Sequence, residues 1–268
     1  MKTGFSAVPA AFAVFLIVPV YWLINMSFQS PHEIRSVFSL FPEQPTLANY
    51  RVIFGDASWY LSYFHACAYV LINVLISVTV ALPAAYAFSR YRFVGDRQMF
   101  FWFLVSRMTP PAVLLVPLVQ VFSHLNLIDT YIAVALAHCM FNVPIAIWIL
   151  EGFISAVPHQ VDETAMIDGY SKPAYLVKIL LPAIAPGIGV TAFFCFMFSW
   201  IELLLANGLT TISSKPIAAV MGRAGGLVGG MQIGLLSAAS VLTLIPGLLM
   251  IYFVRRHIAR GLSLGQVK

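Results

Sequence analysis

Several polar and ionisable residues lie inside long apolar stretches of this sequence. Arg107 is followed by Pro110 and Pro111, which should break a helix because neither has the backbone N–H that helix hydrogen bonding requires. Ionisable groups in apolar surroundings are costly and often line the path of a polar solute. We therefore expect hydrogen bonding to a solute, and no bond-breaking chemistry, from six candidates: Arg107, His138, Asn142, Trp200, Glu202 and Asn73.

These candidates also have structural interpretations. Arg107 could pair with Glu202 or Glu151, or extend its charged end toward water. His138 and Asn142 share a helical face and could hold neighbouring helices together. A sugar or polyol site needs hydrogen-bonding groups and an aromatic surface. The apolar stretches are rich in aromatic residues and poor in charge, which favours a neutral hydroxylated solute.

The sequence contains no recognised catalytic or metal-binding motif. It has no phosphate-binding Gly-x-x-x-x-Gly-Lys-Ser/Thr loop, no His-Glu-x-x-His and no Gly-x-Ser-x-Gly. Cys67, Cys139 and Cys195 are isolated in apolar runs, which excludes a disulfide framework and a paired-cysteine metal site. The glycine-rich run 222–230 is typical of a flexible loop. We expect no catalytic residue, no metal and no cofactor bound by this chain.

The composition indicates an all-α membrane protein. Charged residues make up 9% of the 268 residues and hydrophobic residues 60%, whereas a soluble domain is about 25% charged. The net charge of +5 does not indicate a nucleic-acid partner, because the basic residues lie at the ends of apolar runs. Membrane lipid is the expected surrounding.

Charge-free stretches predict six transmembrane helices in a single domain over residues 1–268. A bilayer-spanning helix needs roughly 20 apolar residues. The first run is too long for a secretory signal, so we interpret it as a retained helix. The predicted spans are about 7–28, 65–89, 98–122, 130–154, 182–206 and 236–256.

The basic residues predict the orientation of the spans. Loops that stay in the cytoplasm carry an excess of Lys and Arg. With both termini in the cytoplasm, the outer segments hold only Arg35, Arg51, Lys215 and Arg223. The cytoplasmic segments then hold ten of the fifteen basic residues: Lys2, Arg90, Arg92, Arg97, Lys172, Lys178, Arg255, Arg256, Arg260 and Lys268.

The loop over residues 158–181, between the fourth and fifth predicted spans, is unusually polar. Pro158 suits the first turn of a helix, Gly169 suits its end, and Ser171 could cap the next short helix. The pattern predicts two short helices joined at a glycine elbow. An ordinary amphipathic loop at the membrane surface is the alternative interpretation.

The spacing in this loop resembles the signature of permease subunits of ATP-binding cassette (ABC) importers. That signature is Glu-Ala-Ala, three residues, Gly, nine residues, Ile, one residue and Leu-Pro. Here Glu163-Thr164-Ala165 is followed at that spacing by Gly169 and by Ile179-Leu180-Leu181-Pro182, and only Thr164 departs. Further blocks of the carbohydrate-uptake branch are resembled by the stretches 84–95, 108–111, 152–158, 198–206 and 260–268. Within that branch, the sequence is most similar to the glycerol and small-polyol permeases.

The resemblance implies the fold of a type I ABC importer permease, with a coupling helix between the fourth and fifth spans. It implies that Ala165 and Ile167 pack into a cleft of a cytoplasmic ATPase, and that Glu163 and Asp168 pair with basic groups there. The family usually has Trp-Asn-Glu where this chain has Trp200-Ile201-Glu202, so any role of that Asn is absent or moved. The implied ATPase-coupling residues are Asp162, Glu163, Ala165, Ile167, Asp168, Gly169 and Tyr170.

The implied partners are a second homologous permease chain, two ATPase subunits that hold ATP and Mg, and an extracytoplasmic solute-binding protein. That protein would contact segments such as 29–62 and 207–235. The implied location is the inner membrane of a bacterium, and the implied solute is a carbohydrate or polyol, with a glycerol-like solute as the leading choice. The alternative function is a self-sufficient secondary carrier or channel for a small neutral solute, which inverted internal repeats would favour. None is evident in the sequence.

Overall fold

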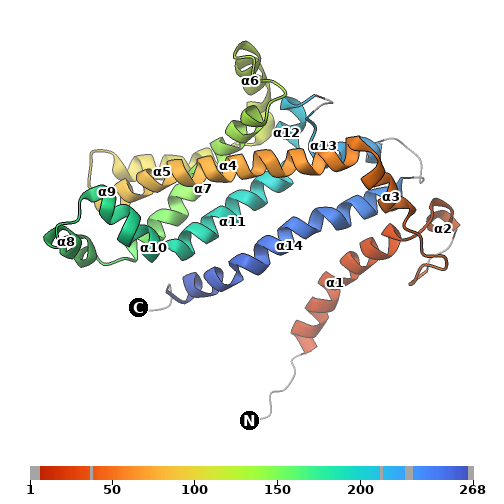
Figure 1. Cartoon of the computed structure of the whole chain (residues 1–268), viewed down its shortest axis with the longest axis horizontal. Helices are drawn as coiled ribbons and strands as arrows, with labels where there is room; N and C mark the ends of the chain where they lie inside the picture. The colour runs from red at the N-terminus through yellow and green to blue at the C-terminus, as the bar shows by residue number, and fades with distance from the viewer. Residues whose placement is uncertain (1–6, 37–38, 212–213, 227–231, 265–268) are drawn as a thin grey trace, which may run out of the picture. The chain divides into compact units, whose positions relative to one another are not determined.

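A computed structural model describes residues 7–36, 39–211, 214–226 and 232–264, and within these residues the chain is helical with no strand (Figure 1). Lys2, the end of the glycine-rich run and the side chains of the C-terminal block 260–268 lie outside the described part. The helices are α1 (Ala7–Ser27), α2 (Pro31–Ser36), α3 (Ala48–Gly55), α4 (Ala57–Arg90), α5 (Asp96–Ser106), α6 (Pro111–His124), α7 (Tyr131–Ser155), α8 (His159–Ile167), α9 (Lys172–Tyr175), the π-helix η1 (Leu176–Leu180), α10 (Leu181–Ala183), α11 (Ala185–Ile201), α12 (Leu204–Leu209), α13 (Ile217–Gly226) and α14 (Ile233–Leu264).

The helices group into two compact units, and the prediction of a single domain stays a prediction. The first unit joins residues 1–64 to residues 217–246. In it, the amide of Asn49 donates to the carbonyl oxygens of Ser27 and Gln29 at 3.0 and 3.1 Å, which ties α3 to the end of α1. The Tyr63 hydroxyl donates to the Ala239 carbonyl at 2.7 Å and joins α4 to α14.

The second unit, residues 65–216 with 247–268, contains the candidate site. Its core lies where α7 packs along α11, and α4 and the loop after α7 add apolar side chains to the same cluster. α7 begins after Thr130, whose hydroxyl accepts a hydrogen bond from the Ala133 amide at 3.2 Å. Small residues such as Ala146 are fully buried on α7 and allow neighbouring helices to approach closely.

By length and apolar composition, the described helices match three of the six predicted spans, or five if each of two bent helix pairs is one span. α4, α7 and the part Ile233–Arg255 of α14 are each long enough to cross a membrane. Two further candidates are bent pairs, α5 with α6 at 95° and Lys172–Ala183 with α11 at 75°. The apolar part Ala11–Ser27 of α1 is shorter than a span, so the sixth crossing stays a prediction.

The predicted helix break at Pro110 and Pro111 is confirmed. α5 ends at Ser106 and α6 begins at Pro111, whose missing N–H costs nothing in a first helical turn. The predicted helix over 182–206 is wrong at both ends, because the bend follows Ala183 and the helix stops at Ile201. At its C-terminal end, Glu202 has an extended backbone and caps the next helix.

The contact between α7 and α11 provides a test of the core. A Cβ added to Gly187 would lie 2.4 Å from Cγ of Phe153, too close without movement of a ring attached near the backbone. We expect Gly187→Ala to lower the free energy of unfolding by about 2 kcal/mol through overpacking. Thermal unfolding of the detergent-solubilised protein measures this.

Gly152→Ala on α7 is the matched control, because nothing lies within 4 Å of its added Cβ. Alanine in a helix interior costs less conformational entropy than glycine, so this variant should be neutral or slightly stabilised. Equal losses in the two variants would contradict close packing at Gly187.

Candidate functional site

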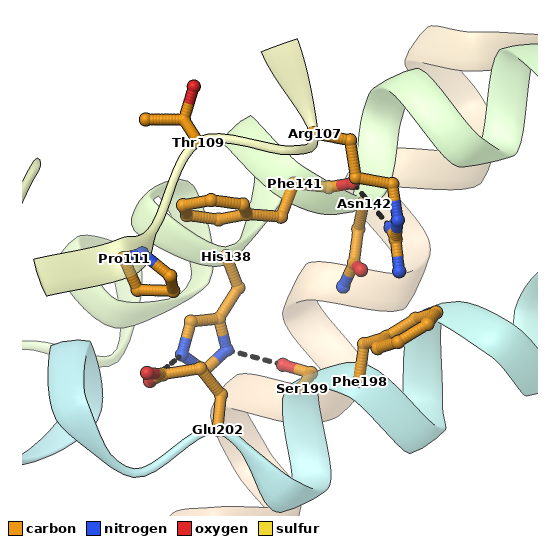
Figure 2. Close-up of a pocket in the computed structure, with 9 residues that line it drawn as sticks. All are labelled: Arg107, Thr109, Pro111, His138, Phe141, Asn142, Phe198, Ser199 and Glu202. Carbon is orange, nitrogen blue, oxygen red and sulfur yellow. Dashed lines mark hydrogen bonds and ion pairs between the residues drawn. The ribbon is translucent and has the colours of Figure 1, made fainter. Parts of the chain in front are cut away.

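A cavity of about 200 Å³ lies in the second unit, where the break after α5 meets α7 and the end of α11 (Figure 2). Its lining residues are Arg107, Thr109, Pro111, His138, Phe141, Asn142, Phe198, Ser199 and Glu202. Four of the six sequence-predicted candidates therefore lie at one cavity. The other two, Asn73 and Trp200, are buried outside its lining, and Trp200 stacks on Phe196 with 5.6 Å between ring centroids.

His138 and Glu202 are hydrogen-bonded to each other at one side of the cavity. The Nδ1 of buried His138 lies 2.5 Å from the Ser199 hydroxyl, and its Nε2 lies 3.1 Å from Oε2 of Glu202. The Glu202 carboxylate also accepts hydrogen bonds from the backbone amides of Leu204 and Leu205 at the start of α12. A carboxylate is favoured at this position because the first N–H groups of a helix have no partner within the helix.

Arg107 presents a positive charge to the cavity without a carboxylate partner. Its Nη1 donates to the carbonyl oxygen of Phe141 at 2.8 Å, and its Cζ lies 3.8 Å from the ring centroid of Phe198, in a cation–π contact. Among the described residues no acid lies within ion-pair distance of it. The alternative that Arg107 pairs with Glu202 or Glu151 is therefore wrong. Glu202 contacts His138, and Glu151 accepts a hydrogen bond from Ser155.

Hydrogen bonds between buried amide side chains link the cavity to α4. The Asn142 side chain donates to Oδ1 of Asn73 at 2.6 Å and to the Cys195 carbonyl at 3.1 Å. Asn73 in turn donates to the carbonyl of Ala135 at 2.9 Å. Asn73 thus has the helix-holding role, while Asn142 both holds helices and lines the cavity.

The polar loop after α7 is the helix, elbow and helix expected from the sequence. α8 is followed by Gly169, whose φ of +83° suits glycine, and then by α9. Two details differ from expectation. Pro158 precedes α8 as its capping residue, and the Ser171 side chain makes no capping hydrogen bond, although the Ser171 carbonyl accepts the first helical bond, from the Tyr175 amide.

The chain after α9 widens into the π-helix η1, which sequence reasoning missed. Pro182 has no N–H to donate to the carbonyl four residues earlier, that of Lys178, so a regular α-helical turn is disfavoured there. π-helical turns occur often at functional sites. This one lies near the end of the loop, and the short helix α10 separates it from α11.

A buried ion pair fixes the loop to the end of α4. Arg90 Nε lies 2.6 Å from Oδ2 of Asp162, and Arg90 Nη2 donates to the Val157 carbonyl at 2.9 Å. The Tyr175 hydroxyl also donates to the Asp162 carboxylate. The side chains of Arg90 and Asp162 are only 3% and 17% exposed. Sequence reasoning did not assign Arg90 this role, since 72 residues separate it from its partner.

The predicted coupling residues divide into two groups. Asp162 is half-buried in the ion pair, and Ala165 is 3% exposed and packs within its own chain. In this chain Ala165 has little surface to offer, and its packing against an ATPase stays a prediction. The outward-facing group consists of Glu163, Ile167, Asp168, Gly169 and Tyr170, of which Ile167 is 85% exposed.

The sequence of this chain is similar to those of known proteins. The family model for binding-protein-dependent transport system inner membrane components matches residues 75–264. A putative ABC transporter permease protein of Streptomyces antibioticus is 31% identical over 85% of this chain and 99% of its own length. The trehalose transport system permease protein SugB of Mycobacterium tuberculosis is 29% identical over 95% and 93%.

A solved structure supports the fold. A chain of a bacterial ABC transporter involved in the import of the acidic polysaccharide alginate superposes with a TM-score of 0.77. The superposition covers 94% of this chain and 93% of that one, at 19% sequence identity. At this identity the likeness concerns the arrangement of helices alone.

The ion pair at the loop generates a prediction. Asp162→Ala leaves Arg90 buried without its carboxylate, which should cost about 3 kcal/mol of stability. Asp96→Ala is the matched control, because its partner Arg92 is 84% exposed and such surface pairs contribute less than about 1 kcal/mol. Thermal unfolding of the two variants compares the pairs, and similar losses in both would exclude a special role for Arg90 and Asp162.

Proposed function

Because this chain belongs to the family of binding-protein-dependent transport system inner membrane components, we propose that it is the transmembrane permease subunit of an ATP-driven importer for a carbohydrate or polyol. A permease subunit is not itself an enzyme, and ATP with Mg is held by separate ATPase subunits. Relatives named as trehalose and diacetylchitobiose permeases favour a carbohydrate solute. A glycerol-like solute is the finer proposal.

The observation that carries this proposal is the rigid loop with an exposed tip. Ile167 is exposed beside the positive-φ elbow at Gly169, while Asp162 anchors the same loop to α4. An exposed apolar side chain on an anchored helix suits insertion into a cleft of another protein. Glu163 and Asp168, both exposed, would pair with basic groups of that cleft.

The proposed assembly contains this chain, a second permease, two ATPase subunits and a binding protein. The loop faces the cytoplasm, as do both termini in the bacterial inner membrane, and it docks on one of two ABC ATPase subunits. A second homologous permease completes the path. The extracytoplasmic binding protein delivers the solute to segments within 29–62 and 207–235.

In the proposed mechanism, ATP binding closes the ATPase pair and moves the loop. Because Arg90 holds α8 to the end of α4, and η1 and α10 join α9 to α11, the motion reaches the helices that line the cavity. The cavity then takes the solute from the binding protein, and ATP hydrolysis resets the loop. In this role the path is lined by Arg107, His138, Asn142 and Glu202. Trp200 and Asn73 are buried outside the lining and hold the helices that carry these residues.

The elbow provides a direct test with a matched control. Gly169 and Gly95 both have φ of +83° and both have nothing within 4 Å of an added Cβ, so leucine strains the backbone equally at each. We expect Gly169→Leu to insert in the membrane, to abolish transport and to weaken ATPase binding. Gly95→Leu should keep at least half of the transport. Normal uptake by Gly169→Leu would contradict the proposal that this loop couples the permease to the ATPase.

The energy source separates an importer subunit from a secondary carrier. In proteoliposomes that hold the intact complex, uptake of the cognate sugar should require ATP and the binding protein, and should persist when ion gradients are dissipated. Uptake that follows an ion gradient in the absence of ATP would favour the carrier.

A further inference from the structure

We propose that the cavity at Arg107, Asn142 and Phe198 is a solute-binding subsite on this chain itself, built for one ring of a neutral sugar or a polyol of similar size. The proposal rests on the proposed import function and assigns the solute contact to named atoms of this subunit. Three observations carry it: a buried acceptor without a partner, the donors and rings around the cavity, and its balance of charge.

The first observation is Oδ1 of Asn142. The residue is 1% exposed, and its amide nitrogen is committed to Asn73 and to the Cys195 carbonyl. These two acceptors fix the orientation of the amide, so its oxygen and nitrogen cannot exchange places. Oδ1 accepts no hydrogen bond within the described part of the chain. A buried acceptor left unpaired is unfavourable, and a hydroxyl group donated by a solute would remove that cost.

Figure 2 shows the Asn142 amide pointing into the space between His138, Arg107 and Phe198. The Arg107 guanidinium uses one N–H group on the Phe141 carbonyl. It has five in all, and those not engaged can donate to the hydroxyl oxygens of a solute. The Phe141 ring lines the same cavity, as does the part of the Phe198 ring that Arg107 leaves uncovered, and both offer apolar surface to the C–H groups of a sugar ring.

The charges of the lining favour a neutral solute. Arg107 contributes one positive charge and Glu202 one negative charge to the same cavity. Hydrogen bonds from His138 and the α12 amides hold the Glu202 carboxylate in place, so its negative charge offsets the positive charge of Arg107. The volume of about 200 Å³ lies below the range of about 300–1,000 Å³ typical of drug-sized ligands. A single ring or a short polyol fits this size, and a longer saccharide would extend beyond the cavity.

Binding to the intact complex, purified in nanodiscs without ATP and without the binding protein, tests the subsite. The probes are D-glucose, D-galactose, D-mannose, xylitol, glycerol and, as an anion, D-glucuronate. We expect at least one neutral probe to bind. Asn142→Leu should weaken its affinity about tenfold through loss of the acceptor. Arg107→Gln, at a partly buried position, should weaken it several-fold through loss of the charged donors.

Ser77→Ala is the matched control, because Ser77 is fully buried between α4 and α7 but does not line the cavity. Its affinity should equal that of the unmodified protein. The subsite is overturned if no neutral probe binds, if D-glucuronate binds more tightly than every neutral probe, or if both cavity variants keep the original affinity. Should Asn142→Leu fail to assemble, the Arg107→Gln result decides.

A separate readout distinguishes failure of the subsite from failure of the proposed function. ATPase activity of the same complex, stimulated by the loaded binding protein, reports import coupling and does not require solute binding in this cavity. Stimulated ATPase activity with no binding overturns the subsite alone. Binding without any stimulation overturns the importer assignment and leaves the cavity assignment in place.

Discussion

The ion pair between Arg90 and Asp162 is the constraint on which the arrangement of the loop depends. A buried charge without a partner is strongly destabilising, so the folded chain strongly favours closure of the loop on the end of α4. Tyr175 adds a hydrogen bond to the same carboxylate and thereby holds both short helices of the loop. A buried pair of this kind contributes little net stability compared with apolar packing. Its effect is a fixed geometry, which is what a force-transmitting loop requires.

The same helix connects this anchor to the cavity. Asn73 lies on α4, about 25 Å from Arg90 by helical rise, and its side chain bonds to Asn142 at the cavity. The chain is not helical at two places beside the cavity, the segment before Pro111 and the turn at Glu202. In a membrane, such irregular backbone is tolerated where it is buried in protein or lines a polar space. The cavity and the helix breaks are therefore parts of one feature.

Much of this architecture could be predicted from local sequence. Pro110 and Pro111 break the third span because of their own covalent structure, and Gly169 marks the elbow because few other residues adopt its backbone conformation. Arg107 and Asn142 were identified as cavity candidates because polar groups are rare in apolar runs. These inferences needed only neighbouring residues.

What could not be predicted depends on contacts between distant segments. Nothing local pairs Arg90 with Asp162, so an internal anchor was interpreted as part of a docking surface. No local pattern indicates that Ala165 packs against residues of its own chain. The end of α11 at Ile201 depends on a carboxylate, Glu202, which binds His138 on another helix while it caps α12.

The central claim is that the loop and the end of α4 move as one body. Spin labels at Val94, which follows α4, and at exposed Gln160 on α8 would report the distance between them in the intact complex. The account predicts the same distance distribution in nucleotide-free and ATP-bound complexes. A shift of more than about 2 Å between the two states would mean that the loop pivots on its own, and would contradict the account.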